Sequence, residues 1–109
     1  RVPLIHYAKG SGHLHEAIRT LDIDALSLDW RDDLRANRVA HGDRFAFQGN
    51  LDPSRMHGTP EAAKVAAQRV LDQAGDAPGH IFNLGHGFAP GAQIDCVEAV
   101  LRLITGEGA

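Results

Sequence analysis

The chain repeats one arrangement four times: a short apolar run, a turn that begins with Gly, Asn, Asp or Trp, and a helical pattern. The apolar runs are Val2 to Ala8, Ala25 to Asp29, Arg44 to Gln48 and His80 to Leu84. Runs of this length are typical of β-strands. Strands that alternate with helices through short connections predict a parallel sheet with helical crossovers. The order of the elements therefore places the chain in the α/β class.

Four helices are predicted to follow these runs. The third is the clearest, because alanine, valine and leucine recur at three- and four-residue spacing from Ala62 to Ala74 and form an apolar stripe. Thr59 and Pro60 predict its N-cap and first helical position, and Gly75 predicts its end. The first two helices are expected at about residues 13–21 and 31–41. The stripe of the fourth helix consists of Ile94, Val97, Leu101 and Ile104.

Length and charge limit the kinds of protein that this sequence encodes. A chain of 109 residues with 43% hydrophobic content is enough for one modest globular domain and not for two. The net charge is -3, and Lys and Arg form no run, which argues against nucleic acid as a partner. No apolar stretch approaches the roughly 20 residues that cross a bilayer, so no membrane partner is expected. The single cysteine, Cys96, excludes an intrachain disulfide and favours a reducing compartment.

Four βα units fit two architectures. One is a small open doubly wound sheet, and the other is half of a (β/α)8 barrel, which needs about 250 residues in total. Composition does not separate them, but the start at Arg1, just before an apolar run, favours a piece of a longer chain. Both architectures carry their chemistry at the carboxyl ends of the strands. Here those ends read AKGSGH (8–13), LDW (28–30), QGNLDP (48–53) and NLGHG (83–87), and we expect them to meet at one rim.

The first strand end resembles a nucleotide-binding turn only in part. Gly10-Ser11-Gly12 follows a strand and opens a helix, and Asp29 ends the next strand, as in a dinucleotide-binding unit. The third glycine of that fingerprint would fall at position 15, where His15 should block the close packing of helix on strand. A glycine turn without a nucleotide is therefore the favoured interpretation, and a small nucleotide-binding α/β module is an alternative.

The polar side chains at the second and third strand ends each have two possible roles. The amides of Gln48 and Asn50 could hold a polar ligand, or Asn50 and Asp52 could cap their own loop and the turn that follows. Asp29 could place a carboxylate on the rim beside Trp30, or it could cap the second helix. The residues alone leave both interpretations of each pair open.

Seven histidines raise the question of a metal site. His13 and His15 are two residues apart on a predicted helix and do not share a face. Cys96 falls in the last helix with no cysteine or histidine at ligand spacing, so a buried structural thiol is predicted and no metal ligand set is predicted. The histidines expected to pack or to be solvated are His6, His41, His57 and His80.

His86 differs from the other histidines because it follows a strand end and stands between two glycines. This position puts its side chain at the predicted rim instead of within the sheet. Gly85 and Gly87 permit backbone conformations and close approaches that a β-carbon would forbid. Consecutive backbone N–H groups beside an imidazole suit a carboxylate or another anion. On these grounds alone, a functional role and a packing role for His86 both stay open.

Five segments, in this order, resemble the last part of the uroporphyrinogen decarboxylase family. They are VPLIHYAKGSG, ALSLDW, FAFQGNLDPS, HIFNLGHG and a carboxyl-terminal helix with VEAV. The resemblance covers essentially all of the chain, which would be about the last third of such an enzyme. It implies a (β/α)8 TIM barrel to which this chain supplies the last four βα units. Residues 1–109 would then be the carboxyl-terminal portion of a single barrel domain, with the amino-terminal half absent.

The resemblance also implies a reaction. The family removes carboxylates from the four acetate side chains of uroporphyrinogen III without a cofactor, and the product is coproporphyrinogen III in haem synthesis. The enzymes act in the cytoplasm, usually as homodimers. His86 matches the functional histidine of the family, which contacts the substrate, so His86 is the predicted catalytic residue. The predicted substrate-binding residues are His86, Gly85, Gly87, Asn50 and Gln48.

Other residues that the family uses lie outside this sequence. Its key aspartate, the arginines that meet substrate carboxylates, and its tyrosine and serine contacts have no counterpart here, so the chain alone is expected to be inactive. One alternative function is a zinc-dependent methyltransferase of the same superfamily. Another is a non-catalytic half barrel that pairs with a second copy of itself through its unpaired strand edges.

Overall fold

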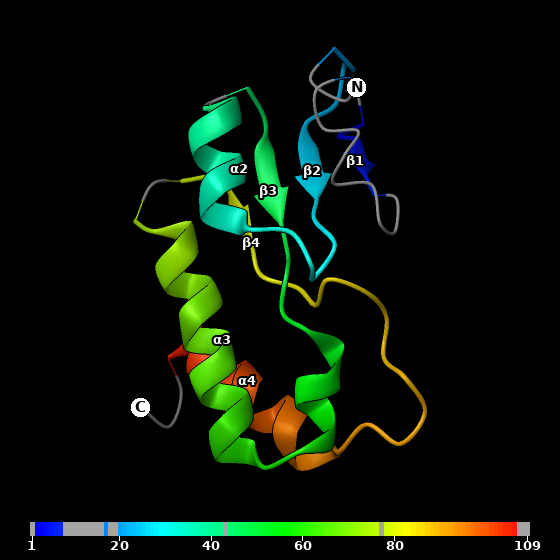
Figure 1. Ribbon diagram of the computed structural model, residues 1–109, viewed down its shortest axis with the longest axis vertical. Coiled ribbons are helices and arrows are strands. Elements are labelled where there is room, and N and C mark those ends of the chain that lie inside the picture. The colour runs from blue at the N-terminus through cyan, green and yellow to red at the C-terminus, as the bar shows by residue number, and fades with distance from the viewer. Residues whose placement is uncertain (1, 8–16, 18–19, 43, 77, 107–109) are drawn as a thin grey trace.

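Four parallel strands form one sheet in the computed structural model, which describes residues 2–7, 17, 20–42, 44–76 and 78–106. The strands are β1 (Ile5–His6), β2 (Ala25–Ser27), β3 (Ala46–Gln48) and β4 (His80–Ile81), and they lie side by side in the order β1-β2-β3-β4. Each strand pairs in parallel with the next one along the chain. Figure 1 shows these neighbouring strands in the upper half of the molecule, with helices beside and below them.

The sequential order separates the two architectures that the sequence left open. In a doubly wound sheet the strand order reverses at a switch point, where the nucleotide binds. In a (β/α)8 barrel each strand pairs with the next one in the chain. The four described strands follow the chain without a reversal. The fold is therefore an α/β arrangement that agrees with part of a barrel, as the sequence predicted.

Alternate residues of the strands face opposite sides of the sheet. Leu26 and Phe47 are paired in the register, and both are buried on the side that the helices cover. There the ring of His41 lies 6.0 Å from that of Phe47. Ile5 and Ile81 belong to the opposite face, where their exposed fractions are 51% and 43%. Among the described residues, this second face therefore carries apolar side chains open to solvent.

Local capping explains where the helices begin and end. The helix α3 (Pro60–Ala74) starts at Thr59, whose Oγ1 accepts a hydrogen bond from the Ala62 backbone N–H, and it stops at Gly75, which has a φ of 73°. The predictions for this helix are confirmed. The helix α2 (Leu34–His41) starts three residues later than predicted, because Asp33, and not Asp29, is its N-cap.

The last helix, α4 (Ile94–Thr105), was predicted correctly in place, but only Val97 and Ile104 of its predicted stripe pack against the core. Ile94 and Leu101 belong to the predicted stripe, yet their exposed fractions are 72% and 54%. Cys96 and Val100 are buried instead. The apolar residues of this helix cover more than one face, and only the face toward α3 and the Pro53–His57 turn is covered. Cys96 is a free buried thiol, as predicted.

The strands are shorter than the apolar runs that predicted them. Beyond the strand ends, neighbouring backbones stay paired only at isolated positions. Leu28 N–H donates to the Gln48 carbonyl at 2.8 Å, and Leu51 forms a parallel bridge with Leu84. The 3-10 helix η2 (Pro53–His57) was not predicted; Asp52 caps it by accepting from Ser54 N–H. The helix predicted at about residues 13–21 falls mostly outside the described residues.

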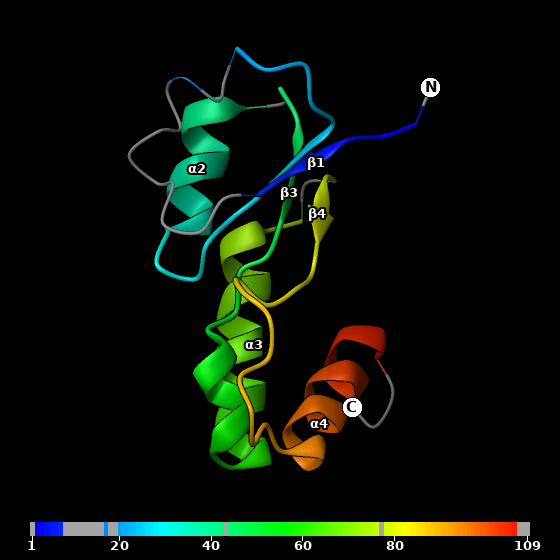
Figure 2. The same ribbon diagram turned by 90° about the vertical axis from the view of Figure 1, so that its right-hand side faces the viewer.

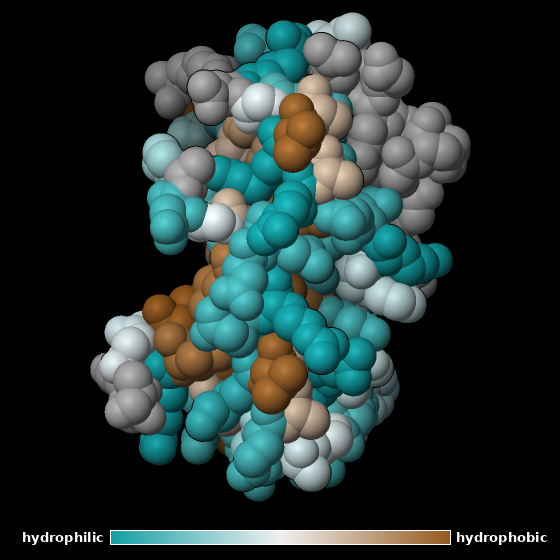
Figure 3. All heavy atoms as spheres, turned by 60° about the vertical axis from the view of Figure 1, so that its left-hand side comes forward, coloured by the Kyte–Doolittle hydropathy of each residue, from teal (hydrophilic) through white to brown (hydrophobic). Residues whose placement is uncertain are grey.

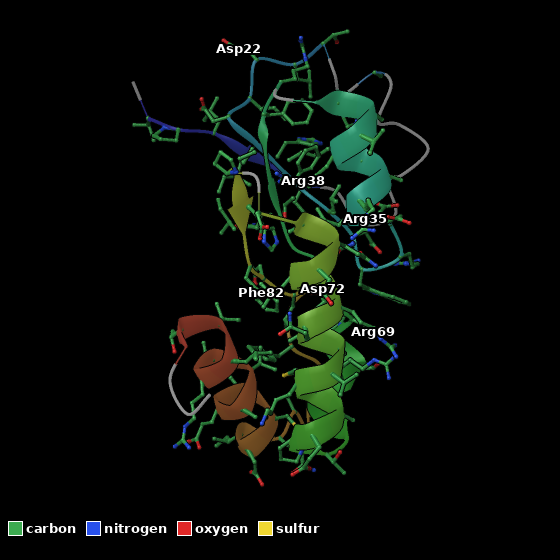
Figure 4. The ribbon with its side chains drawn as sticks, turned by 90° about the vertical axis from the view of Figure 1, so that its left-hand side faces the viewer. Asp22, Arg35, Arg38, Arg69, Asp72 and Phe82 are labelled. Carbon is green, nitrogen blue, oxygen red and sulfur yellow. The ribbon has the colours of Figure 1, made fainter. Side chains whose placement is uncertain are left out.

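The helices pack on one another as well as on the sheet. Figure 2 shows α3 and α4 side by side, with α2 beside the strands. Figure 4 shows Arg35 of α2 next to Asp72 of α3, and here the Arg35 guanidinium donates to the Asp72 backbone carbonyl at 2.7 Å. None of the helices in the described ranges is both long enough and apolar enough to cross a lipid bilayer.

Candidate active site

The carboxyl ends of all four strands contribute to one pocket of about 240 Å³. Tyr7 follows β1, while Ser27 and Gln48 are the last residues of β2 and β3. The segment after β4 completes the pocket with Asn83, Leu84, His86 and Gly87. Two of the four predicted rim segments, 48–53 and 83–87, contribute to this pocket, whereas 28–30 do not line it and 8–13 lie outside the described residues.

His86 is an exposed side chain on this rim, and its neighbour is Tyr7. The Tyr7 hydroxyl lies 3.2 Å from His86 Nδ1, and the two rings are stacked at a centroid distance of 6.3 Å with an angle of 27° between their planes. The same hydroxyl donates to the Gly85 carbonyl at 2.8 Å. These contacts fix the imidazole of His86 at the pocket wall.

Gln48 lies in the same pocket, where its side chain is oriented by a neighbour in the sheet. Gln48 Nε2 donates to Ser27 Oγ at 3.0 Å, across the paired ends of β3 and β2. Ser27 is buried, with 5% of its surface exposed. A hydroxyl and an amide thus line the pocket opposite the segment that carries His86, and both groups are suited to hold a polar ligand.

Asn50 lies outside this pocket, although the sequence made it a candidate for the same site. It is buried, and its Nδ2 donates to the backbone carbonyls of Asp29 at 3.0 Å and Asp32 at 2.6 Å. These bonds join the segment after β3 to the segment after β2. The Asn50 amide therefore bridges two loops instead of capping its own loop, the use that the sequence had left open, and its role in substrate binding stays a prediction.

Asp29 is buried rather than displayed on the rim. Its carboxylate accepts from the backbone N–H and the Nε of Arg31, at 2.9 and 3.0 Å. The Arg31 guanidinium carbon in turn lies 5.0 Å from the centroid of the Trp30 ring. The interpretation in which Asp29 caps the second helix, one of the two that the sequence left open, is excluded, because its carboxylate binds Arg31 and Asp33 is the N-cap of α2.

The two glycines beside His86 have different reasons to be glycine. Gly85 is buried, and a β-carbon there would lie 2.6 Å from Trp30 Cβ and still closer to the Trp30 backbone. Gly87 is exposed, and a β-carbon there would meet nothing within 4 Å. Neither residue has a positive φ. Gly85 therefore allows the close approach of two backbones, whereas only Gly87 borders the pocket.

Tyr7 is the residue of this site that sequence reasoning missed. It stands two residues after Ile5, so strand alternation already placed it on the same face, at the end of the first apolar run. Burial raises the pKa of the Tyr7 hydroxyl, the Asp29 carboxylate raises it further, Arg31 lowers it, and Asp32 raises it. The phenol is consequently neutral at physiological pH and acts as a hydrogen-bond donor.

A second cavity, of about 220 Å³, lies between α4 and the segment that follows β4. Its lining is almost entirely apolar and includes Phe82, Leu84 and Phe88. Figure 4 shows Phe82 between β4 and α4, and Figure 3 shows apolar surface in the lower half of the molecule, where α3 and α4 lie. With so few polar groups this cavity cannot orient a charged substrate, so the pocket beside His86 is the candidate active site.

The described residues assemble no group of three or more His, Cys, Asp or Glu side chains that could hold a metal ion. Cys96 is buried in α4, and its thiol lies 3.5 Å from the Gly58 carbonyl. Gly10-Ser11-Gly12 and His15, on which the nucleotide-binding alternative rested, fall outside the described residues.

Four parallel strands that pair in chain order, with a polar pocket at their carboxyl ends, are typical of α/β barrels. The chain is therefore part of an α/β barrel protein. The family model for uroporphyrinogen decarboxylase (URO-D) matches residues 1–106. A uroporphyrinogen decarboxylase from Magnetococcus marinus is 42% identical over 108 residues, which are 99% of this chain and 30% of that protein. One from Aromatoleum aromaticum is 46% identical over 104 residues, 95% of this chain and 28% of that protein. One from Azoarcus sp. is 49% identical over 89 residues, 82% of this chain and 25% of that protein.

The chain belongs to the uroporphyrinogen decarboxylase family. This confirms the resemblance that its five ordered segments carry, and the family has the TIM-barrel fold that the resemblance implied. The chain spans only 25–30% of the length of these three relatives.

Proposed function

We propose that this chain is the carboxyl-terminal portion of a uroporphyrinogen decarboxylase. Its substrate is uroporphyrinogen III, whose four acetate side chains become methyl groups as coproporphyrinogen III forms. The observation that carries the proposal is the position of His86: it lies in the NLGHG segment, in a polar pocket at the carboxyl ends of the strands, within a family match over residues 1–106. Chemistry in α/β barrels takes place at these strand ends.

The reaction needs proton transfer and charge stabilisation but no cofactor. Protonation of a pyrrole ring carbon makes a cation, which accepts the electron pair of the bond that joins the acetate methylene to its carboxylate. CO₂ then leaves, a proton converts the methylene to a methyl group, and the ring carbon gives back its proton. Each acetate that reacts thus consumes one proton and releases one CO₂. The substrate ring itself is the electron sink.

The side chains of the pocket are suited to some of these reaction steps. The imidazole of His86 holds a substrate carboxylate or supplies a proton, since histidine is the side chain that acts most often as a general acid or base. Gln48 and the backbone of Gly87 contribute hydrogen bonds to the same substrate, whereas Gly85, whose backbone groups bind Leu51 and Tyr7, acts by positioning the segment. Asn50 acts by holding two of the rim segments together through its bonds to the Asp29 and Asp32 carbonyls.

The pocket described here forms only part of the complete site. Ligand sites of whole proteins are usually about 300–1,000 Å³, and this pocket holds about 240 Å³. We assign the rest to an amino-terminal part of the same barrel domain, to which residues 1–109 add the last four βα units. That part would also cover the apolar face with Ile5 and Ile81. The complete enzyme is expected to be a cytoplasmic homodimer.

Replacement of His86 tests the proposal in the complete protein. His86→Ala should lower the rate of coproporphyrinogen formation from uroporphyrinogen III at least tenfold, because acid–base groups typically contribute about 10²–10⁴-fold. The matched control is His57→Ala, since His57 is an exposed histidine on η2 that does not line the pocket. A wild-type rate in the His86→Ala protein would contradict both roles proposed for this residue. Absence of decarboxylation by the wild-type protein would contradict the function itself.

A further inference from the structure

The hydroxyl of Tyr7 lies between two groups of the segment after β4. Its oxygen is 2.8 Å from the Gly85 carbonyl oxygen and 3.2 Å from His86 Nδ1. A phenol has one proton to donate, and a carbonyl can only accept. The shorter contact, to Gly85, therefore uses the Tyr7 proton. The longer contact is then a hydrogen bond only if His86 Nδ1 carries a proton and donates it to the Tyr7 oxygen.

If Tyr7 donates to Gly85 and His86 Nδ1 donates to Tyr7, the neutral imidazole of His86 is held in one tautomer. A neutral imidazole carries a proton on one of its two nitrogens, and the hydrogen bond of one nitrogen decides the state of the other. With the proton on Nδ1, the lone pair is on Nε2. We propose that Tyr7 is a positioning residue that holds His86 in its Nδ1–H tautomer, so that Nε2 accepts a proton or a hydrogen bond in the pocket when the ring is neutral, and donates when it is charged.

The acceptor of the Tyr7 proton is itself held in place. Gly85 N–H donates to the Leu51 carbonyl at 2.8 Å, and Gly85 packs against the backbone of Trp30. The carbonyl of Gly85 thus has a fixed position, and the Tyr7 hydroxyl keeps its orientation toward it. The stacking of the Tyr7 and His86 rings, with 27° between their planes, limits rotation of the imidazole.

The charged groups near Tyr7 support a protonated phenol. Those that act on it are Asp29, Arg31 and Asp32, all in the segment after β2. Burial and the two carboxylates raise the pKa of Tyr7, and Arg31 opposes them. Because a raised pKa keeps the phenol neutral to higher pH, the proton needed for the Gly85 bond is present throughout the physiological range.

The tautomer is measured directly by long-range ¹H–¹⁵N correlation spectra of the complete protein labelled with ¹⁵N-histidine. The His86 signal is assigned by its loss in His86→Gln. The expected wild-type pattern is Nδ1–H, and in Tyr7→Phe it should move toward the mixture of tautomers that a solvated imidazole shows. An Nε2–H pattern in the wild type, or the same pattern in both proteins, would overturn the proposal. The wild-type spectrum alone decides it if Tyr7→Phe does not fold.

A kinetic measurement links the tautomer to the reaction, and this part rests on the proposed function. Tyr7→Phe keeps the ring and its packing, so KM should change little while kcat falls on the order of tenfold and its pH profile shifts, since a misplaced acid–base group loses part of its effect. Equal kcat values with a changed tautomer would contradict the proposed role of Nε2. If the wild-type protein shows no decarboxylation, the proposed function fails, whereas the spectra still decide the contact between Tyr7 and His86.

Discussion

At the scale of single residues, the two glycines around His86 serve different purposes. Gly85 is needed for the fold, and Gly87 leaves the pocket open. In the sequence the two look alike, and the freedom of backbone conformation and close approach that glycine allows applied equally to both. The structure places Gly85 against the Trp30 backbone and leaves Gly87 open at the pocket. Only atomic contacts distinguish them, because no sequence pattern shows which distant segment approaches a glycine.

Alanine at each position measures this difference. Gly85→Ala must push the segment after β4 away from Trp30, so the free energy of unfolding should fall by about 3 kcal/mol or more. Gly87→Ala has open space and should change it by no more than about 0.5 kcal/mol. Urea unfolding of the complete protein gives both values. If Gly87 borders the substrate as proposed, Gly87→Ala should still raise KM, and equal stability losses in the two variants would refute the assignment.

At the scale of elements, Asn50 connects the loops that follow β2 and β3. Sequence reasoning identified its segment as important and listed capping as one use of its amide. It could not tell which backbone atoms the amide would meet, because Asp29 and Asp32 lie 21 and 18 residues away in the chain.

Asn50→Asp tests this connection. The change replaces an N–H₂ donor with an oxygen that faces two carbonyl oxygens, so the free energy of unfolding should fall by roughly 1–3 kcal/mol. Asn37→Asp is the matched control, because Asn37 Nδ2 likewise donates to a backbone carbonyl, that of Asp33, but this bond lies near the surface. Its effect should be smaller. A loss of activity without any loss of thermal stability in Asn50→Asp would instead favour direct contact between Asn50 and the substrate.

At the scale of the whole molecule, much of the fold followed from the sequence. Four apolar runs and their helices gave the α/β class, and Thr59, Pro60 and Gly75 gave the bounds of α3. The exposed Ile94 and Leu101 of α4 were not foreseen, since a helix with several apolar faces does not reveal which face is covered. The barrel itself was suggested by the resemblance, and the sequential strand order agrees with it.

The exposed sheet face leads to a prediction for residues 1–109 prepared alone. Ile5 and Ile81 lie on that face, and β1 and β4 are the edge strands of the described sheet. The isolated piece should therefore self-associate and should not decarboxylate uroporphyrinogen III. Sedimentation velocity should show a larger monomer fraction for the Ile5→Lys/Ile81→Lys double variant. Val39→Lys, on the exposed side of α2, is the control, and equal association of all three proteins would contradict the prediction.

The strand order β1-β2-β3-β4 also has a consequence for how the chain is made. The ribosome releases the strands in the same sequence in which they pair, so each new strand finds its partner already synthesised. These pairings are not local, since the paired residues 5 and 25, 25 and 46, and 47 and 80 are separated by a complete crossover, but none of them has to wait for a strand that is synthesised later. The sheet can grow one strand at a time during translation, and the segment with His86 is the last of the four strand ends to join it.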